Sequence, residues 1–475
     1  MRHAVTSLES NVVTPRPAAG PSPAAVARTR LLLQGPIAPT LLRLAAPNLV
    51  VNVVLITVTT SVDAHFAGRL GPATLAGLAL VFPLLMLMQQ MANFSMGGAL
   101  TAAIARAIGA GRHEDASALV LHGLLIASVI AALFASVFLL VGPSLYAFMG
   151  GSGAILAAAI EYSNAIFAGA FAYWLLSTLT SAVRATGQLA LLAWVYVGVE
   201  ILHIGLVPLL VFGWGPVPSL GIAGAGVATI VSFTASSAVL AAYLASGKAA
   251  VRLTLRGVRL RASLFGDILR TGVPLSLQPI LNNLSLALLM GYAGTLGAAA
   301  LAGVGAAVRL EYLMYPVVFG LGATVVAMVG TNVGAGQLTR AIRIAWIAAG
   351  LAAAASGLTG LVAMAWPQVW IFLFTDAPEI SATAATFLAV AALGYAFIGM
   401  NTLTQAFQAM GQTFWPLFAN ASRAAVIALG GWIVLNVTGG GVIGLAIVTA
   451  SGLAITGIIV ATAFWLKMHR KLEAS

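Results

Sequence analysis

The sequence predicts an all-α integral membrane protein, with twelve transmembrane helices arranged as two six-helix lobes related by a pseudo-twofold axis along the membrane normal. Of the 475 residues, 61% are hydrophobic and only 7% are charged, whereas a soluble domain has roughly 25% charged residues. Apolar stretches long enough to cross a bilayer recur along the chain, and the second half repeats landmarks of the first. A soluble enzyme, a nucleic-acid-binding protein and a disordered scaffold are therefore excluded.

The predicted helices follow an N-terminal tail. Residues 1–36 are rich in Pro and Ala and lack the apolar segment and cleavage site of a secretory signal, so we predict a disordered cytoplasmic tail. Twelve apolar stretches of roughly 20 to 30 residues follow, each able to cross a hydrocarbon core of about 30 Å as a helix. They are 41–66, 75–107, 117–142, 155–183, 190–213, 221–246, 272–297, 303–333, 342–366, 380–408, 416–436 and 441–466.

The charges predict the domain boundaries and the orientation. We expect an N-terminal lobe at 37–246, a basic cytoplasmic linker at 247–270, a C-terminal lobe at 271–466 and a cytoplasmic C-terminal tail at 467–475. The formal net charge is +11, and most of the 22 Lys and Arg residues fall in segments on one side of this layout. The positive-inside rule therefore places both termini in the cytoplasm. The linker could lie on anionic lipid or be solvated.

An internal repeat relates the two predicted lobes. The matched pairs are Pro47 with Pro274, Gly71 with Gly297, Gly109 with Gly334, Gly187 with Gly411, and Gly221 with Gly441. Six spans return the chain to its starting side, so both halves share one orientation and should enclose a cavity between them. This pattern predicts a transporter rather than a channel ring.

Polar residues present in only one half are the best candidates for function, because turns and close helix contacts explain the repeated glycines. Glu200 lies near mid-bilayer in the predicted fifth span. His203 follows one turn later, so the two side chains share a helix face. A buried carboxylate beside an imidazole suits proton coupling, although the pair could instead hold this helix to a neighbour.

Two acids lie near the outer boundary. Asp63 is about 20 residues beyond Arg43 in the first span, so simple helical rise places it at the outer interface unless the helix is long or tilted. There it could pair with Arg69. Glu161 lies in the first part of the fourth span, where an acid stabilises the dipole of its own helix.

Three charges fall in the C-terminal half. Arg309 and Glu311 are two residues apart in the predicted eighth span, so they face different directions and each needs a partner from another helix. These two residues could hold neighbouring helices together, or they could function in a cavity. Arg423 is expected to extend toward the inner lipid headgroups.

Amides are concentrated in the second, seventh and tenth predicted spans. In lipid they must face the protein interior, where they could line a substrate path or join helices by hydrogen bonds. The same spans also contain Gln90 and Gln408. The candidates for a substrate cavity, with the two C-terminal charges included, are Gln89, Asn93, Gln278, Asn282, Asn283, Arg309, Glu311, Asn401 and Gln405.

No catalytic motif is present in the sequence. It contains no Cys, no phosphate-binding Gly loop, no His-Glu-x-x-His and no Gly-x-Ser-x-Gly motif. We therefore expect no enzyme activity, no metal and no cofactor. Without a nucleotide-binding motif the energy must come from an ion gradient or another subunit, which predicts secondary active transport.

Four motifs follow one another along the chain. They are Leu41-Leu-Arg-Leu-Ala-Ala-Pro47, Val62-Asp63-Ala-His-Phe-Ala-Gly68-Arg-Leu-Gly71, Ala105-Arg-Ala-Ile-Gly109-Ala-Gly111 and Val329-Gly-Thr-Asn-Val-Gly334-Ala-Gly336. In this order they resemble the multidrug and toxic compound extrusion (MATE) family. The resemblance covers nearly the whole chain after residue 36. It implies a multi-pass exporter that alternates between inward and outward openings, exchanging protons or sodium ions for organic, often cationic, multidrug-type substrates.

The resemblance also implies site residues. Asp63 matches the first-helix acid that serves as the coupling site in this family, which favours a long first helix facing an outward cavity. Asn282 stands where the NorM-like branch has an acid. The pattern is closer to the bacterial DinF-like branch, but His203 and Val207 replace its Asn and Asp. We expect Glu200 and His203 to compensate for the missing second acid and to form, with Asp63, a polar set that binds the coupling ion. We prefer H⁺ to Na⁺ as that ion.

The remaining expectations concern partners and alternatives. We expect a monomer in the lipid bilayer of the bacterial cytoplasmic (inner) membrane, acting on a small organic substrate and binding no nucleic acid. One alternative is a lipid-linked oligosaccharide flippase of the same superfamily architecture, which should carry several cavity cations, whereas Arg309 is the sole clear candidate. A membrane-embedded enzyme is the other alternative, although the short loops hold no polar cluster.

Overall fold

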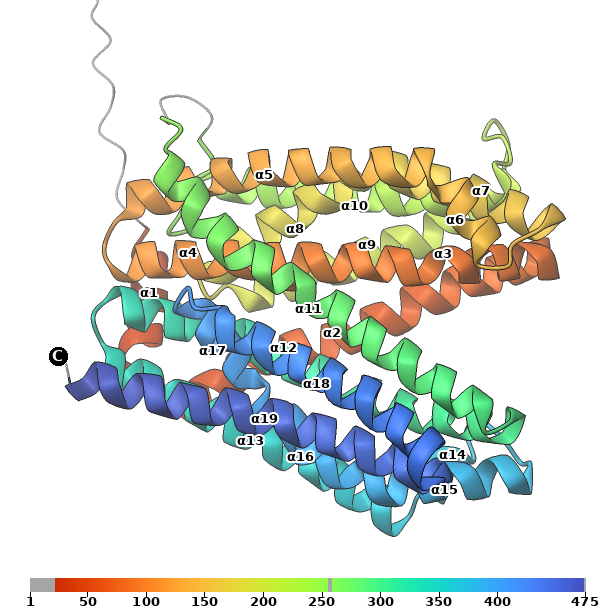
Figure 1. Ribbon diagram of the computed structural model, residues 1–475. Helices are drawn as coiled ribbons and strands as arrows, with labels where there is room; N and C mark the ends of the chain where they lie inside the picture. The colour runs from red at the N-terminus through yellow and green to blue at the C-terminus, as the bar shows by residue number, and fades with distance from the viewer. Residues whose placement is uncertain (1–21, 255–258, 474–475) are drawn as a thin grey trace, which may run out of the picture.

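In the computed structural model, residues 22–254 and 259–473 are described, and they are helical almost throughout, without a β-strand (Figure 1). The N-terminal helices are α1 Pro23–Gln34, α2 Ile37–Leu70, α3 Pro72–Gln90, the π-helical turn η1 Met91–Met96, α4 Gly97–Gly109, α5 His113–Leu140, α6 Gly142–Phe148, α7 Gly153–Ala168, α8 Ala170–Ala185, α9 Leu189–Phe212 and α10 Gly221–Ala245. The C-terminal helices are α11 Ala262–Thr295, α12 Ala298–Gly334, α13 Leu338–Ala365, α14 Gln368–Ile371, α15 Pro378–Ala391, η2 Ala392–Gly394, α16 Tyr395–Met400, α17 Thr402–Ala409, α18 Phe414–Ile433, η3 Val434–Thr438 and α19 Gly441–Glu473.

The predicted membrane spans correspond to these helices. Within the described ranges, ten helices are long and apolar enough to cross a membrane, and α7 with α8 forms an eleventh span that bends by 46°. The bend lies at Gly169, between the two helices. Helix α2 is 34 residues long, about 50 Å at 1.5 Å per residue, and occupies the position of the first predicted span. The prediction of an all-α, twelve-helix membrane protein is confirmed.

Two lobes are visible in Figure 1, one formed by α2–α10 and the other by α11–α19. Each lobe has its own core: Tyr162, Phe167 and Trp174 are buried in the N-terminal lobe, and Phe387 and Tyr395 in the C-terminal lobe. The lobes converge at one end of the molecule and diverge at the other. The two-lobe prediction is therefore confirmed as well.

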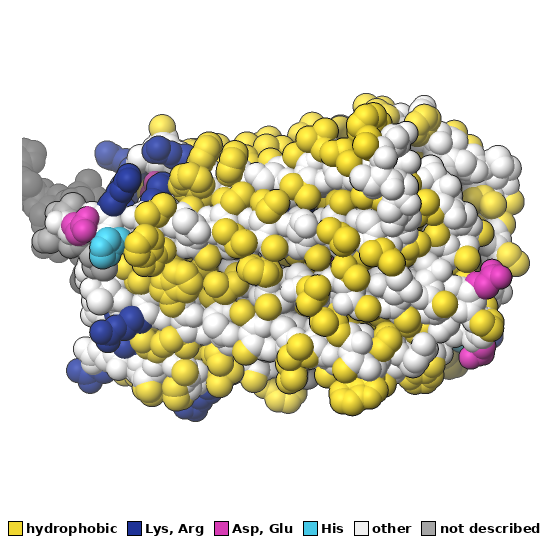
Figure 2. All heavy atoms as spheres, turned by 60° about the horizontal axis from the view of Figure 1, so that its bottom comes forward, with side chains coloured by type: hydrophobic (Ala, Val, Ile, Leu, Met, Phe, Trp, Pro, Cys, Tyr) yellow, Lys and Arg dark blue, Asp and Glu magenta, His cyan; other side chains and the backbone are white. Residues whose placement is uncertain are grey.

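The surface of the molecule matches a lipid environment. Figure 2 shows a broad hydrophobic surface with Lys and Arg gathered at one end, the end where the lobes converge; we call it the basic end. Leu133 on α5 and Leu361 on α13 are among the exposed apolar side chains of the helix faces. Side chains of this kind are stable when they face lipid rather than water.

Close backbone contacts join the lobes at the basic end, where α4 crosses α12. A Cβ atom at Gly109 would lie 1.9 Å from the carbonyl oxygen of Thr331, and one at Gly334 would lie 2.1 Å from that of Arg106. Only glycine permits these two approaches. Across the same seam, Arg106 Nη1 donates to the carbonyl of Ala409 at 2.8 Å. The basic end is therefore closed.

The repeat also appears in the backbone angles of the turns. Gly71 and Gly297, which precede the second helix of each lobe, have φ values of 127° and 112°. Gly111 and Gly336, after α4 and α12, have φ values of 73° and 76°. Because L-residues with side chains rarely adopt such angles, the duplicated glycines preserve duplicated turns.

Three segments differ from their predicted boundaries. Residues 23–34, expected within a disordered tail, form α1, and the first 21 residues of that tail lie outside the described part of the chain. The predicted linker, 247–270, ends early because α11 begins at Ala262. Within the linker, the buried side chain of Val251 packs against the N-terminal lobe. Helix α19 continues through most of the predicted C-terminal tail.

Candidate substrate cavity and coupling cluster

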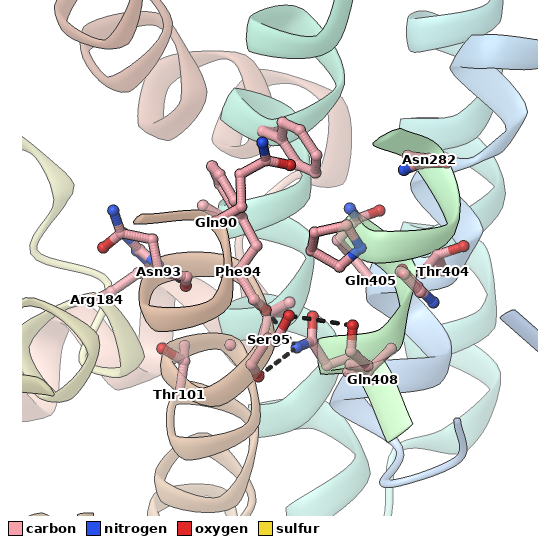
Figure 3. A pocket seen from close by; sticks show the side chains of 17 residues that line it. Gln90, Asn93, Phe94, Ser95, Thr101, Arg184, Asn282, Thr404, Gln405 and Gln408 are labelled. Carbon is pink, nitrogen blue, oxygen red and sulfur yellow. Dashed lines mark hydrogen bonds between the residues drawn. The ribbon is translucent and has the colours of Figure 1, made fainter. Parts of the chain in front are cut away.

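A cavity that is open to solvent lies between the lobes, and the empty space in it, with the solvent at its opening included, is about 640 Å³. Figure 3 shows side chains from η1 and α4 facing side chains from α11 and α17 across it. The lining residues from the N-terminal lobe are Gln90, Asn93, Phe94, Ser95, Gly98, Thr101 and Arg184. Those from the C-terminal lobe are Leu275, Gln278, Pro279, Asn282, Phe319, Ala323, Val326, Thr404, Gln405 and Gln408.

The cavity lies where equivalent positions of the repeat meet. The match of Gly109 with Gly334 also aligns Phe94 with Phe319, and these two rings stack across the lobe boundary with centroids 4.1 Å apart. Similarly, the match of Gly187 with Gly411 aligns Arg184 with Gln408. Both members of each pair line the cavity, so the cavity is close to the pseudo-twofold axis.

Hydrogen bonds between the lobes close the cavity on the side of the basic end. Gln408 Nε2 donates to the carbonyl of Phe94 at 2.8 Å, and Ser95 Oγ donates to the carbonyl of Leu275 at 3.1 Å. Dashed lines in Figure 3 mark hydrogen bonds of Gln408 to this part of η1. The cavity therefore has a polar floor made by both lobes.

Among the described residues that line the cavity, Arg184 contributes the one charged side chain. It belongs to α8, one residue before that helix ends, and only 8% of it is exposed. Its Nη1 lies 3.5 Å from the carbonyl oxygen of Asn93. Sequence reasoning missed Arg184, because a basic residue just beyond a predicted span was counted only as an orientation signal.

Asp63 and His203 form a buried cluster within the N-terminal lobe. His203 Nε2 on α9 lies 3.0 Å from Asp63 Oδ1 on α2, and the hydroxyl of Tyr162 on α7 donates to Asp63 Oδ2 at 3.4 Å. Asp63 is 6% exposed and His203 is 2% exposed. Two helices, α7 and α9, thus supply groups that donate hydrogen bonds to a carboxylate on a third helix of the same lobe, α2.

Glu200 is also buried, one turn before His203 on α9, so two predicted coupling residues share this helix.

The alternative of an Asp63–Arg69 pair is not what the structure shows, because the guanidinium of Arg69 lies over the ring of Phe212 at 5.1 Å. The long α2 places Asp63 seven residues before its C-terminal end, a distance of about 10 Å along the helix.

The expectation for Glu161 is corrected. Its Oε1 accepts a hydrogen bond from the backbone N–H of Ala223 at 3.4 Å, near the N-terminus of α10, which begins at Gly221. The carboxylate thus lies at the positive end of a neighbouring helix rather than of its own. Sequence spacing within α7 could not show this contact between helices.

Glu311 has the partner on another helix that the sequence analysis required. Arg423 Nη2 on α18 donates to Glu311 Oε1 at 2.5 Å, and the hydroxyl of Tyr315 lies 3.1 Å from Arg423 Nη1 and 3.3 Å from Glu311 Oε1. The prediction that Arg423 extends to the lipid headgroups is therefore wrong. Arg309 is exposed over the ring of Phe374 and does not line the cavity.

The predicted amides divide between the cavity and other positions. Asn93, Gln278, Asn282 and Gln405 line the cavity. Besides Arg309, four predicted residues do not line the cavity: Gln89, Asn283, Glu311 and Asn401. The Nδ2 of Asn283 donates to the carbonyl of Pro279 in its own helix, and the Oδ1 of Asn401 accepts a hydrogen bond from Thr404. The lining residues absent from the predicted cavity set include Gln90, Ser95, Thr101, Gln408 and the stacked phenylalanines.

Comparison with known proteins identifies the family. The MatE family model matches residues 49–209 and 274–433, one segment in each lobe and together more than half of the chain. The chain belongs to this family. The predicted MATE family efflux transporter is thereby confirmed, and the duplicated match agrees with the internal repeat.

Several MATE family relatives and structures resemble this chain. The FAD transporter of Shewanella oneidensis is 28% identical over 65% of this chain and 68% of its own length. The probable multidrug resistance protein NorM of Mesorhizobium japonicum is 29% identical over 73% and 76%. An outward-facing multidrug resistance MATE transporter has a similar fold, with a TM-score of 0.82, 24% identity and coverage of 94% of this chain and 99% of that one.

A MOP superfamily transporter of Pyrococcus furiosus also shares the fold, with a TM-score of 0.82 and 23% identity over 92% of this chain and 97% of that one. Identities at this level establish the architecture of two lobes around a cavity. A shared architecture alone assigns no role to individual residues of this MATE protein.

Proposed function

We propose that this MATE family protein is a monomeric secondary active exporter of small organic compounds, driven by proton antiport across the bacterial cytoplasmic (inner) membrane without a catalytic step. The observation that carries the proposal is the Asp63 carboxylate, buried within one lobe and contacted by His203 at 3.0 Å and Tyr162 at 3.4 Å. A buried ionisable group at a helix junction in a membrane protein is a candidate proton site.

The chemistry of the cluster supports reversible protonation. When Asp63 is ionised, the N–H of His203 and the hydroxyl of Tyr162 both donate to it and stabilise the charge. When Asp63 takes up a proton, one of these hydrogen bonds must reorganise. Because the partners lie on α7 and α9, protonation changes the contacts that hold three helices together and can bias the shape of the lobe.

Protons rather than sodium ions are proposed because of the ligand types. Na⁺ binding favours several oxygen ligands around the ion, as for other hard cations, whereas the closest partner of Asp63 is an imidazole nitrogen. Glu200, one turn away on α9, is proposed to complete the cluster and to respond to the same proton.

The proposed orientation places the basic end in the cytoplasm, as the positive-inside rule requires. The closed contacts of α4 with α12 and of Arg106 with Ala409 then lie on the cytoplasmic side. The structure corresponds to an outward-facing state under this proposal. Export requires the opposite closure, so these contacts must separate once in each transport cycle.

The charges among the residues that line the cavity bear on the charge of the substrate. The family resemblance favours a cationic compound, yet no carboxylate is among the residues that line the cavity. A relative named as an FAD transporter makes export of an anionic aromatic compound a second candidate, which the buried Arg184 favours. A lipid-linked oligosaccharide flippase is less well supported, because one lining cation is fewer than a pyrophosphate group would engage.

Transport in inverted membrane vesicles tests the proposal. An imposed pH gradient, acidic inside the vesicle, should drive uptake of a fluorescent dye, and a sodium gradient alone should not. Asp63→Asn should reduce the proton-driven rate by at least about tenfold, as expected for loss of the coupling group. Asp376→Asn removes an exposed carboxylate of an outer loop and should retain the wild-type rate.

Two further variants separate coupling from bracing. If Glu200 and His203 belong to the proton site, Glu200→Gln and His203→Ala should shift the pH at which export is half-maximal. Wild-type pH dependence in both variants would leave the pair with a structural role only. Full proton-driven uptake by Asp63→Asn would overturn the proposed function itself.

A further inference from the structure

The guanidinium of Arg184 is the charged group on which this inference depends. Its side chain lines the cavity between the lobes, yet 92% of the residue is buried. Figure 3 shows it beside Asn93 on the N-terminal side of the cavity. An arginine side chain stays protonated in proteins, so this region carries a permanent positive charge.

The contacts of Arg184 do not balance that charge. Among the residues that the structure describes, no carboxylate forms an ion pair with Arg184, and its Nε has no hydrogen-bond partner. The single hydrogen bond from its guanidinium, to the carbonyl of Asn93, is long at 3.5 Å. A buried charge without a counter-ion is costly, so the site lacks an anion that a ligand can supply.

The repeat shows that this charge belongs to one lobe only. Gln408, which the match of Gly187 with Gly411 aligns with Arg184, uses its Nε2 to hold the carbonyl of Phe94. The equivalent position of the C-terminal lobe therefore serves closure and carries no charge. Shared scaffold geometry does not explain an arginine here, since the duplicated scaffold accepts a neutral amide at the same place.

Other lining groups indicate the rest of the ligand. The stacked rings of Phe94 and Phe319, one from each lobe, present apolar surface to the cavity. Amides at Asn282, Gln405 and Gln278 surround them with donors and acceptors. A flat aromatic compound with polar edges suits apolar walls with a few placed polar groups.

We propose that the cavity binds and exports organic anions, in which a carboxylate or phosphate attached to a flat aromatic ring pairs with the guanidinium of Arg184. This substrate class rests on the proposed transport function. The planar guanidinium matches either anion with two parallel hydrogen bonds. The assignment reverses the positive charge that the family resemblance implies for the substrate.

Two xanthene dyes of similar shape provide the test. Fluorescein is an anion at neutral pH. The methyl ester of rhodamine is a cation, because amino groups replace the hydroxyl and keto oxygens attached to the xanthene rings and the carboxylate is blocked. Binding to the purified full-length protein is followed by fluorescence anisotropy, and uptake by inverted vesicles under an acidic-inside gradient. The wild-type protein should bind and take up fluorescein at least about tenfold better than the rhodamine ester.

Variants at Arg184 assign the preference to its charge. Arg184→Gln should weaken fluorescein binding by at least about tenfold, the loss expected for a charge-assisted hydrogen bond, and leave binding of the rhodamine ester unchanged or improved. Arg184→Lys keeps the charge and should retain a preference for fluorescein. Arg343→Gln removes an exposed arginine of α13 outside the cavity and should change neither dye.

The outcomes separate this inference from the proposed function. Proton-driven uptake of the rhodamine ester in preference to fluorescein, by the wild-type protein, would overturn the anion assignment and leave proton antiport intact. Anion-selective binding without any response of uptake to the pH gradient would overturn proton antiport and support the anion site. The wild-type dye preference decides the inference even if Arg184→Gln does not fold.

Discussion

Asp63 and Glu311 are both buried carboxylates in the membrane region, but their partners differ. Asp63 contacts an imidazole and a phenol, which can each exist in a neutral form and exchange a proton. Glu311 contacts Arg423 at 2.5 Å, and a guanidinium stays charged. A carboxylate next to a permanent cation is a poor reversible proton site, so we place coupling in the N-terminal lobe and bracing in the C-terminal lobe.

The bracing role predicts the cost of breaking the ion pair. Glu311→Gln should lower the free energy of unfolding by about 3–5 kcal/mol, because Arg423 remains buried without its counter-ion. Replacing both residues with apolar side chains, Glu311→Leu with Arg423→Met, should recover most of that loss. Unfolding in detergent, followed by circular dichroism, measures the difference.

A matched control for this prediction is Glu379→Gln, which removes an exposed carboxylate in the first turn of α15 and should change the unfolding free energy little. A loss in Glu311→Gln no larger than that of the control would show that the Glu311–Arg423 pair does not brace the lobe.

For single residues, burial in the membrane region could be predicted from the sequence better than contacts with side chains of other helices. The buried positions of Glu200 and His203 could be inferred from hydropathy and repeat asymmetry, whereas helical rise placed Asp63 at the outer interface and only the family resemblance favoured a longer helix. The Asp63–His203 contact joins residues that are 140 positions apart in the chain. Arg184 was not predicted because it follows the predicted span 155–183, whereas the structure places it in the last turn of α8, where it lines the cavity. Applying the repeat comparison to span ends, where Arg184 aligns with Gln408, would have found it.

Helix α1 bridges the two lobes at the basic end. At its start, Ser22 Oγ donates to the carbonyl of Lys248, beyond α10, at 2.9 Å. Near its end, the carbonyl of Leu32 accepts from Asn332 Nδ2 on α12 at 3.0 Å, and the Leu32 side chain is buried in the core of the C-terminal lobe. Because α1 contacts both lobes, it stabilises the state in which the basic end is closed.

Weakening α1 is therefore expected to open the basic end. In a Gln405→Cys background, Leu32→Glu should increase labelling of the cavity cysteine by a membrane-impermeant maleimide added to inverted vesicles. The expected increase is roughly fivefold, as a bias of about 1 kcal/mol between states would give. The chain contains no cysteine of its own, so the label reports this position alone.

Val26→Glu is the matched control, because Val26 lies on α1 but is 53% exposed. Equal labelling of the Leu32→Glu and Val26→Glu proteins would contradict the bridging role. The sequence could not predict α1, since an isolated helix of 12 residues has little intrinsic stability and this helix depends on docking to both lobes.

For the whole molecule, the two-lobe fold could be predicted because hydropathy fixes the spans and the repeat fixes their symmetry. The state of the transporter could not be predicted in this way. Both the inward and the outward arrangement satisfy the same apolar pattern, and they differ only in contacts between lobes such as those of Gly109 and Gly334. Such contacts join residues that are far apart in the sequence and leave no periodic pattern along the chain.

In proton antiport through Asp63, the exported compound and the proton occupy the protein alternately, so binding of the compound should release a proton. Proton release from the purified protein measures this exchange. Purified protein in weak buffer is mixed with whichever xanthene dye it exports, and the pH is followed with an electrode. We predict that the wild-type protein releases protons when the dye binds, and that Asp63→Asn binds the dye without releasing them. Equal proton release by the two proteins would contradict the account.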